Sequence, residues 1–356
     1  MKHIPIANNS IKLFSKKNLS GKICLSPYVS IEVNLKGDVR LCGCLSWMPT
    51  TVGNLFENTI DEILSSPLSQ SIRNSIASGT YEYCNEHDCG VMHRPGGLNS
   101  IDFLPPAVVE LVNDSSMYLM PNEISLAIDA TCNLSCPSCR TAVIKNNAET
   151  VERLVELGNR LRTNLFTTPT DQHIRLHTST SGELFASPLL LSFVNSIPVD
   201  DFPNLALCIQ TNGLMAERNW HKLGPMQSHV KKITVTSDAA RPATYEKLRR
   251  GGRWPDIQQA LKWISEKKKE NGMQLHMRMV VQHSNYQEIP EFYEQAMLLG
   301  ADEIEYARLF NWATYSTEEF QHHDVFNPAH PEFDQAQIIL NQVKHLPKVF
   351  FYGGLS

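Results

Sequence analysis

Short apolar runs of strand length alternate with longer helical patterns between about residue 123 and residue 346. In the longer stretches, apolar residues recur every three or four positions, as they do on one face of a helix. Repeated strand–helix units predict a parallel sheet with right-handed crossovers. The expected strands are 123–129, 173–178, 205–211, 230–236, 274–281 and 303–309, and the expected helices include 149–161, 256–269, 289–299 and 331–345.

Six such units predict an α/β fold of the partial (β/α)6, TIM-type barrel kind. In barrels of this type the functional groups lie at the carboxyl ends of the strands. In the helix over 149–161, we expect Val151, Leu154, Val155 and Leu161 to lie on one apolar face.

The first 119 residues show a different pattern. Alternating residues over 29–35, a turn at Lys36-Gly37-Asp38 and a return over 39–41 predict a β-hairpin. A helical pattern over 60–76 contains Pro67, which should kink or split the helix. We therefore expect a small α+β domain over 1–119, a barrel over 120–346, and a tail or closing strand over 347–356.

Composition narrows the class of protein. The chain has 356 residues, of which 42% are hydrophobic and 19% charged, so it has material for a sizeable core. A formal net charge of −5 argues against non-specific nucleic-acid binding. We expect no membrane-spanning segment and no secretory signal. Most of the nine cysteines fall in close groups, which in a chain without an export signal indicates metal ligands and not disulfides. We therefore expect the protein in the reducing cytoplasm.

Three cysteines with the spacing CxxxCxxC follow the first expected barrel strand: Cys132, Cys136 and Cys139. Three thiolates can hold three irons of a cubane [4Fe–4S] cluster and leave the fourth iron without a protein ligand. Electron-transfer clusters usually take four cysteines. An open iron is suited to binding a substrate or cofactor, as the open position of a catalytic metal site is.

A strand, this cysteine run and five further strand–helix units resemble the radical S-adenosylmethionine (SAM) superfamily. Ser181-Gly182-Glu183 resembles the family's GGE segment, which binds the amino group of SAM. Thr211-Asn212-Gly213 is similar to its TNG motif, and Ser237-Asp238 with Thr244–Arg249 is similar to its SxD…TYExxR stretch, whose serine and arginine approach SAM. The chain departs from the family at Ser138, where an aromatic residue is usual, and at Ser181, where glycine is usual.

The resemblance implies a SAM-binding [4Fe–4S] cluster on the three cysteines. It also implies reductive cleavage of SAM to a 5′-deoxyadenosyl radical that abstracts a hydrogen atom from substrate carbon. Ser181, Gly182, Glu183, Thr211, Asn212, Ser237 and Arg249 are the implied SAM-binding residues. An electron donor such as flavodoxin or ferredoxin is the implied partner.

A second group of cysteines lies in the N-terminal domain. The hairpin turn at Gly37 can bring Cys24 and Cys42 together, and Cys84 and Cys89 form a second pair. Their CX12GX4C start resembles the SPASM and twitch modules, which carry auxiliary [4Fe–4S] clusters. We expect one auxiliary cluster on these four residues, with Cys44 as an alternative to Cys42. A structural zinc site with four cysteines is the competing hypothesis.

Three functions compete. A fully liganded auxiliary cluster suits electron transfer, which favours oxidation or cross-linking of a peptide side chain. Only 23 residues precede Cys24, so we expect no added leader-peptide-binding domain. The second possibility is dehydrogenation or epimerisation of a sugar or aminocyclitol, with Cys208 as hydrogen-atom donor in an epimerase. The third is a non-enzymatic iron–sulfur or zinc protein, for which the SAM-like motifs would have no use.

Overall fold

The structure is a computed structural model that describes residues 18–86, 89–93, 96–178 and 181–355. The chain divides into two compact units, each made of separate sequence segments. Unit 1 comprises Met1–Asp129, Ala148–Ser181 and Ile197–Leu205, and unit 2 comprises Ala130–Asn147, Gly182–Ser196 and Ala206–Ser356. The boundaries expected at residues 119 and 346 remain predictions.

The main sheet of unit 1 joins the N-terminal hairpin to the first two barrel-type strands. Its order is β7 (Ile174–Thr178), β6 (Glu123–Ala127), β2 (Ser30–Asn34), β3 (Asp38–Arg40) and β4 (Gly53–Asn54). The hairpin strands β2, β3 and β4 pair antiparallel, as their turn at Gly37 predicts. On its other side β2 pairs in parallel with β6, which is in turn parallel to β7. A separate ladder joins β1 (Lys22–Ile23) to β5 (Asn99–Ser100).

The helix expected over 60–76 is two helices, α2 (Ile60–Ser65) and α3 (Pro67–Ala77). Ser66 lies between them with extended backbone, and its hydroxyl accepts a hydrogen bond from the backbone of Ser69. Pro67 takes the first helical position, where its missing N–H costs nothing. The other helical segments of unit 1 are α1 (Ser26–Val29), α4 (Gly90–His93), η1 (Ile101–Phe103), α5 (Pro106–Asn113), α6 (Ala148–Leu165) and η3 (Val199–Asp201).

The apolar face expected for α6 is partly wrong. Its buried residues are Leu154, Leu157 and Leu161, which form one stripe at three- and four-residue spacing. Val155 is 50% exposed and Val151 is 36% exposed. Val155 follows Leu154 directly, so it lies about 100° further around the helix and outside the stripe.

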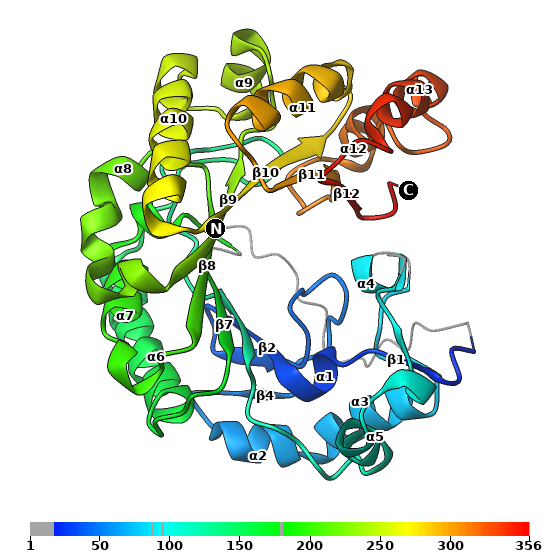
Figure 1. Ribbon diagram of the computed structural model, residues 1–356, viewed down its shortest axis with the longest axis vertical. Coiled ribbons are helices and arrows are strands. Elements are labelled where there is room, and N and C mark those ends of the chain that lie inside the picture. The colour runs from blue at the N-terminus through cyan, green and yellow to red at the C-terminus, as the bar shows by residue number, and fades with distance from the viewer. Residues whose placement is uncertain (1–17, 87–88, 94–95, 179–180, 356) are drawn as a thin grey trace. The chain divides into compact units, whose positions relative to one another are not determined.

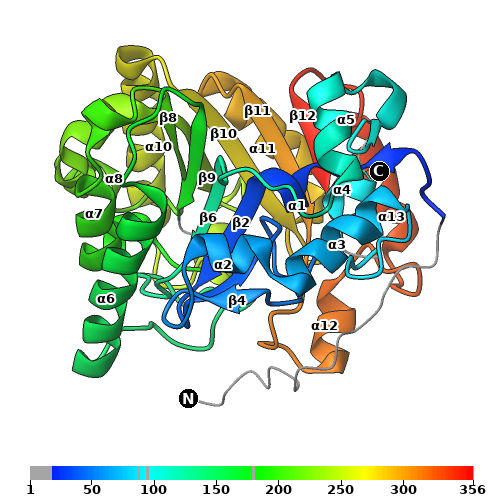
Figure 2. The same cartoon turned by 90° about the horizontal axis from the view of Figure 1, so that it is seen from below.

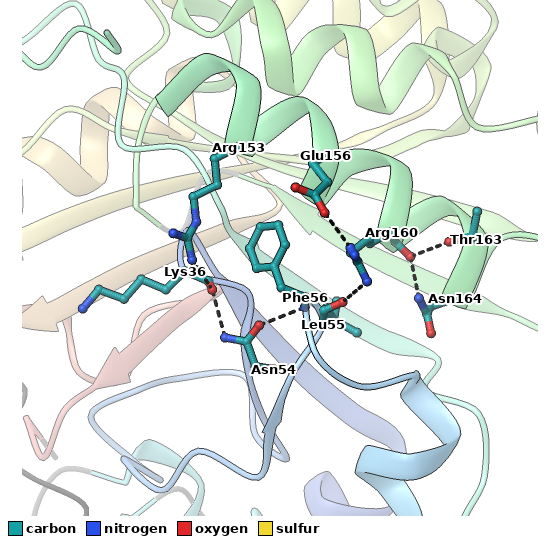
Figure 3. Close-up of polar contacts among 9 residues, drawn as sticks. All are labelled: Lys36, Asn54, Leu55, Phe56, Arg153, Glu156, Arg160, Thr163 and Asn164. Atoms are coloured by element: carbon teal, nitrogen blue, oxygen red, sulfur yellow. Dashed lines mark hydrogen bonds and ion pairs between the residues drawn. The ribbon is translucent and has the colours of Figure 1, made fainter. Parts of the chain in front are cut away.

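The packing of α6 in unit 1 centres on Phe56, which follows β4 (Figure 3). The guanidinium groups of Arg153 and Arg160 lie 4.7 and 5.8 Å from the centre of its ring. Arg153 also donates to the carbonyl of Lys36, and Arg160 to that of Leu55. Two cation–π contacts and two hydrogen bonds thus attach α6 to the hairpin turn and to the segment after β4.

Unit 2 contains five strands in the order β12 (Val349–Tyr352), β11 (Glu303–Arg308), β10 (Gln274–Val281), β9 (Val230–Thr236) and β8 (Leu205–Thr211). All neighbouring pairs are parallel. Helices alternate with the strands along the chain, and Figure 1 shows α10 and α11 on the outer side of these strands. The α/β class is confirmed, and the last residues of the chain contain a strand, β12, that pairs with β11.

The helical segments of unit 2 are η2 (Leu184–Ala186), α7 (Pro188–Asn195), α8 (Ala216–Asn219), η4 (Trp220–His229), α9 (Pro242–Leu248), α10 (Trp254–Asn271), η5 (Tyr286–Glu288), α11 (Ile289–Leu298), α12 (Thr317–His323) and α13 (Phe333–Val343). Figure 2 gives the view from below, with α12 and α13 near one end of the strand set. Outward-facing side chains of the strands, such as Val235, Met279 and Tyr306, are fully buried.

No helix in the described part of the chain is long and apolar enough to cross a membrane.

Candidate iron–sulfur and SAM site

The CxxxCxxC loop lies in unit 2 and is closed by backbone hydrogen bonds. The backbone N–H groups of Cys139 and Arg140 both donate to the carbonyl of Cys136. The N–H of Ser135 donates to the carbonyl of Arg250, which ties the loop to the segment after α9. Cys132 and Cys136 are buried, whereas Cys139 is exposed. The loop therefore holds two sulfurs inside and presents the third at the surface.

Each of the three sulfurs accepts a contact from a different polar side chain. The amide nitrogen of Asn212 lies 3.8 Å from the Cys132 sulfur, and Nη1 of Arg249 lies 3.6 Å from that of Cys136. Nη2 of Arg140 lies 3.4 Å from the Cys139 sulfur. Burial raises the pKa of the Cys132 thiol, and Arg140 opposes the rise. The two cations and the amide would offset the negative charge of a cluster bound to the three sulfurs. The donor set therefore fits an anionic iron–sulfur cluster.

Arg249 is held in place by Asp238. Its Nη2 lies 2.9 Å from a carboxylate oxygen of Asp238, whose other oxygen accepts from the backbone of Val280 at 2.7 Å. Burial lowers the pKa of the Arg249 guanidinium, but Asp238 and Cys136 raise it more, so that the group stays charged. Asp238 itself has φ +60°, an uncommon backbone conformation outside glycine. The turn after β9 thus points a carboxylate at the arginine that contacts the cysteine loop.

Glu183 is fully buried, and both of its carboxylate oxygens accept protein hydrogen bonds. One oxygen accepts from the hydroxyl of Thr211 at 2.7 Å and from the backbone of Phe185 at 3.1 Å. The other accepts from the backbone of Asn212 at 2.7 Å. Burial raises the pKa of Glu183, and these hydrogen bonds oppose the rise. The carboxylate therefore joins η2 to the end of β8, beside the cysteine loop.

Unit 2 brings together Cys132, Cys136, Cys139, Glu183, Thr211, Asn212 and Arg249 through these contacts. Ser237 is buried, and its backbone donates to the carbonyl of Arg278. Gly182 is half-buried. Ser181 belongs to unit 1, where its hydroxyl donates to the carbonyl of Asp129. Cys208 is buried on β8. The roles expected for all these residues remain predictions.

Two charged residues of this site were not identified from the sequence. One is Arg140, and the other is Asp238 as the partner of Arg249. A signal for Arg140 exists, because it directly follows the third cysteine of the run. Asp238 was noted only as part of a motif, and its pairing with Arg249 depends on the turn after β9.

In unit 1, four of the five cysteines of the N-terminal segment line one pocket. Its lining includes Cys24, Cys42, Cys84 and Cys89, together with Tyr81. Cys44 is not part of the lining, and its sulfur lies 3.1 Å from the hydroxyl of Ser46.

Burial raises the pKa of each of these thiols, to about 11 for Cys89 and well above the usual value for Cys42. The four groups also oppose one another's ionisation, because each thiolate would face other sulfurs. Four thiols in one buried pocket fit a metal centre that supplies the compensating positive charge. Among the described residues, no group of three or more His, Cys, Asp or Glu side chains is already placed to hold a metal ion.

Tyr81 positions the first of these cysteines. Its hydroxyl donates to the carbonyl of Lys22 at 2.6 Å and accepts from the backbone N–H of Cys24 at 3.0 Å. The residue is fully buried and has φ +51°. The hydroxyl therefore fixes the end of β1 and the following Cys24 against the segment that carries Cys84.

The same stretch matches a known family model, described as an iron-sulfur cluster-binding domain. Residues 24–90 match SPASM. The expected SPASM-like module before the barrel strands is confirmed by this match, which includes all four cysteines of the pocket. No curated protein sequence matches the chain.

Solved structures similar to this chain share little sequence with it. SuiB of Streptococcus suis, bound to the precursor peptide SuiA, is 15% identical, covers 69% of this chain and 52% of its own, and has a TM-score of 0.47. Methylornithine synthase (PylB) is 12% identical over 62% of this chain and 61% of its own, with a TM-score of 0.39. A radical SAM methyltransferase from Sphaerobacter thermophilus is 16% identical over 62% of this chain and 63% of its own, with a TM-score of 0.37. The chain thus spans about half the length of SuiB.

Proposed function

We propose that this protein is a radical SAM enzyme with a SPASM auxiliary cluster, and that it oxidises or cross-links a peptide. The observation that carries the proposal is the set of contacts on the CxxxCxxC loop. Asn212, Arg249 and Arg140 each approach one of the sulfurs of Cys132, Cys136 and Cys139. A loop that only stapled the fold would need no such charge compensation.

With a [4Fe–4S] cluster and SAM bound there, the site would supply one-electron cleavage of SAM and removal of a hydrogen atom from substrate carbon. The chain's own residues have simpler tasks. Arg249 and Arg140 balance the charge of the thiolates, and Glu183 fixes the end of β8 beside the loop. We propose that the carboxylate of Glu183 also faces the amino group of SAM, a charge-assisted contact.

The pocket of unit 1 supports net oxidation. Cys24, Cys42, Cys84 and Cys89 would give an auxiliary cluster four protein ligands. A cluster without an open iron has no position for substrate, so it is suited to accepting an electron from a substrate radical. We propose Cys42 as ligand over Cys44, because only Cys42 lines the pocket.

A count of iron and acid-labile sulfide per chain tests this proposal. The protein is reconstituted without oxygen as wild type, as the triple variant C132A/C136A/C139A, and as C24A/C84A. We expect two cubanes in the wild type and one in each variant. Zinc in the pocket of unit 1 would leave one cubane in the wild type and reject the auxiliary cluster.

Release of 5′-deoxyadenosine tests the reaction. Dithionite-reduced wild type is incubated with SAM, and the nucleoside is measured by liquid chromatography. We expect release from the wild type and from C24A/C84A, but none from the triple variant. If the fully reconstituted wild type releases no 5′-deoxyadenosine, the proposal that the protein is a radical SAM enzyme is contradicted.

Epimerisation of a small polar molecule is the second candidate, and the position of Cys208 favours it. Cys208 and Gln210 lie two residues apart on β8 and therefore share one face of the strand. On that face Gln210 accepts a hydrogen bond from Arg278 of β10, so Cys208 is on the polar side of the strands. If Cys208 donates a hydrogen atom to a substrate radical, Cys208→Ala would abolish deuterium uptake into product in deuterated solvent while SAM cleavage continues. Unchanged uptake would remove this candidate.

A further inference from the structure

One row of polar residues crosses three neighbouring strands of unit 2. Thr236 of β9 is in register with Arg278 of β10, and Arg278 is in register with Glu305 of β11. Residues in register on parallel strands point to the same face of the sheet. The opposite face carries Val235, Met279 and other apolar side chains, so this row faces away from the covering helices.

Each member of the row has one buried polar atom without a hydrogen-bond partner. These atoms are Oγ1 of Thr236, Nε of Arg278 and Oε1 of Glu305. Thr236 is only 7% exposed and Glu305 only 9%. A buried polar atom without a partner destabilises the folded protein, and such atoms are rare in folded proteins. Three of them at adjacent register positions indicate a place where a polar ligand completes the hydrogen bonds.

The rest of the row is rigidly held. Nη1 of Arg278 donates to Gln210 of β8, and Nη2 donates to Glu305, both at 2.8 Å. The free Nε is therefore fixed in direction. The side chain of Arg278 remains 24% exposed, so the row borders a surface that a ligand can approach.

Charge indicates what that ligand is. Arg278 and Glu305 form an ion pair, and the nearby Asp238 is paired with Arg249. The row is thus close to neutral, and a fully charged group would meet no unbalanced partner. An amide group, by contrast, offers a carbonyl oxygen to Nε of Arg278 and an N–H to Oε1 of Glu305.

An apolar residue occupies the next register position of the row. Phe350 of β12 is in register with Glu305 and is 47% exposed. A ligand with an amide group beside an apolar side chain would match both features, which a simple sugar would not.

We propose that Thr236, Arg278 and Glu305 form a binding subsite for a main-chain or side-chain amide of the substrate. The subsite rests on the proposed function and specifies a peptide over a sugar-like substrate. Arg278 is its central donor, and Gln210 is a positioning residue that acts through Arg278.

The test uses the oxidised, cluster-loaded protein and N-acetyl-L-alanine N′-methylamide, a small probe with two amide groups. Binding is followed by saturation-transfer NMR on the probe. We expect a clear signal with the wild type and a signal at least fivefold weaker with Thr236→Val and with Glu305→Gln. Thr236→Val removes a hydroxyl that has no partner, so it should not disturb folding. Thr317→Val, on the exposed surface of α12, is the matched control and should bind as the wild type does.

Sodium acetate and methylammonium serve as probes with only one of the two hydrogen-bonding roles. We expect both to give weaker signals than the amide. The proposal is overturned if the wild type gives no signal, if Thr236→Val and Glu305→Gln bind the amide normally, or if SAM displaces the probe. Displacement by SAM would assign the row to the methionyl group of the cofactor.

Release of 5′-deoxyadenosine separates the two proposals. Thr317→Val, the control variant, should release it from SAM as the wild type does, because its side chain lies on the exposed surface of α12. If the wild type releases none, the enzyme proposal fails whatever the amide probe shows.

Discussion

At the scale of single residues, Arg249 connects a cysteine of the loop with a buried carboxylate. It contacts the Cys136 sulfur through Nη1 and Asp238 through Nη2. A positive charge beside a cluster ligand favours the reduced, more negative cluster. The arginine expected to approach SAM is thus also placed to influence the electron affinity of the cluster.

We expect Arg249→Gln to lower the midpoint potential of the cluster. Losing a charge-assisted hydrogen bond of about 1.5–3 kcal/mol corresponds to roughly 65–130 mV for one electron. The measurement is a redox titration followed by electron paramagnetic resonance. Arg253→Gln removes an exposed guanidinium from the same segment and should leave the potential unchanged. An unchanged potential in Arg249→Gln would exclude this role.

The residue scale also shows which part of the site can be predicted from sequence. Cys132, Cys136 and Cys139 are close in the chain, so their spacing alone indicates a common ligand. The row of Thr236, Arg278 and Glu305 could not be predicted in this way. Its members lie on three strands, and only the register of the sheet brings them together.

At the scale of elements, Tyr81 joins two parts of the SPASM segment. We expect Tyr81→Phe to leave the backbone groups of Lys22 and Cys24 without a partner, at a cost of about 1–3 kcal/mol. The variant should unfold at lower temperature and lose iron from the pocket of unit 1 faster under a chelator. Tyr83→Phe is the control, because Tyr83 is a buried tyrosine of the same segment. Equal iron loss in both variants would contradict the role of the Tyr81 hydroxyl.

Helix α12 of unit 2 should respond to acid. Burial lowers the pKa of His323 below its usual 6.5, and His322, His283 and Lys247 lower it further, while Glu319 opposes them. The unfolded chain therefore binds this proton at a higher pH than the folded chain. Neutral His323 therefore contributes to the free energy of unfolding above about pH 6.5. This contribution is lost as the pH falls toward the pKa of His323 in the folded protein.

We expect hydrogen exchange in residues 316–330 to increase, relative to the rest of unit 2, between pH 7 and pH 5 after correction for intrinsic rates. His323→Gln has no such titration and should flatten the pH dependence. The same pH dependence in His323→Gln would show that another group controls the segment.

The strands of unit 2 could be predicted from the sequence, whereas the buried face of α6 could be predicted only in part. The expected bounds of β8, β9 and β10 agree with the structure, because each strand is a compact apolar run ended by a turn. The face of α6 could not be predicted fully. Val155 is apolar like the leucines of the buried stripe, and only the helix's contacts within unit 1 decide which stripe is buried.

At the scale of the whole molecule, the N-terminal segment and the first barrel-type strands are parts of one unit. We expect a chain that begins at residue 120 to be less soluble and less stable than the full chain. It would leave β6 without its parallel partner β2 and the arginines of α6 without Phe56. Soluble yield and resistance to limited proteolysis measure this effect.

Phe56→Leu in the full chain isolates the second contribution. It should lower stability by about 1–2 kcal/mol, because leucine retains the apolar contact but loses both cation–π contacts.

If the shortened chain were as soluble and as protease-resistant as the full one, unit 1 would not depend on its first segment. The sequence pattern places residues 1–119 in a domain of their own, and this boundary remains a prediction.

The parallel pairing of β2 with β6 has a consequence for biosynthesis. All four thiols of the unit 1 pocket leave the ribosome before Glu123, the residue that pairs with Ser30. The hairpin must then wait with one open edge until the later strand has been translated, a non-local closure that is slow and exposed to aggregation. Metal delivery to the nascent chain would therefore compete with misassembly, and expression at a slower rate with ample iron supply should favour the correctly filled protein.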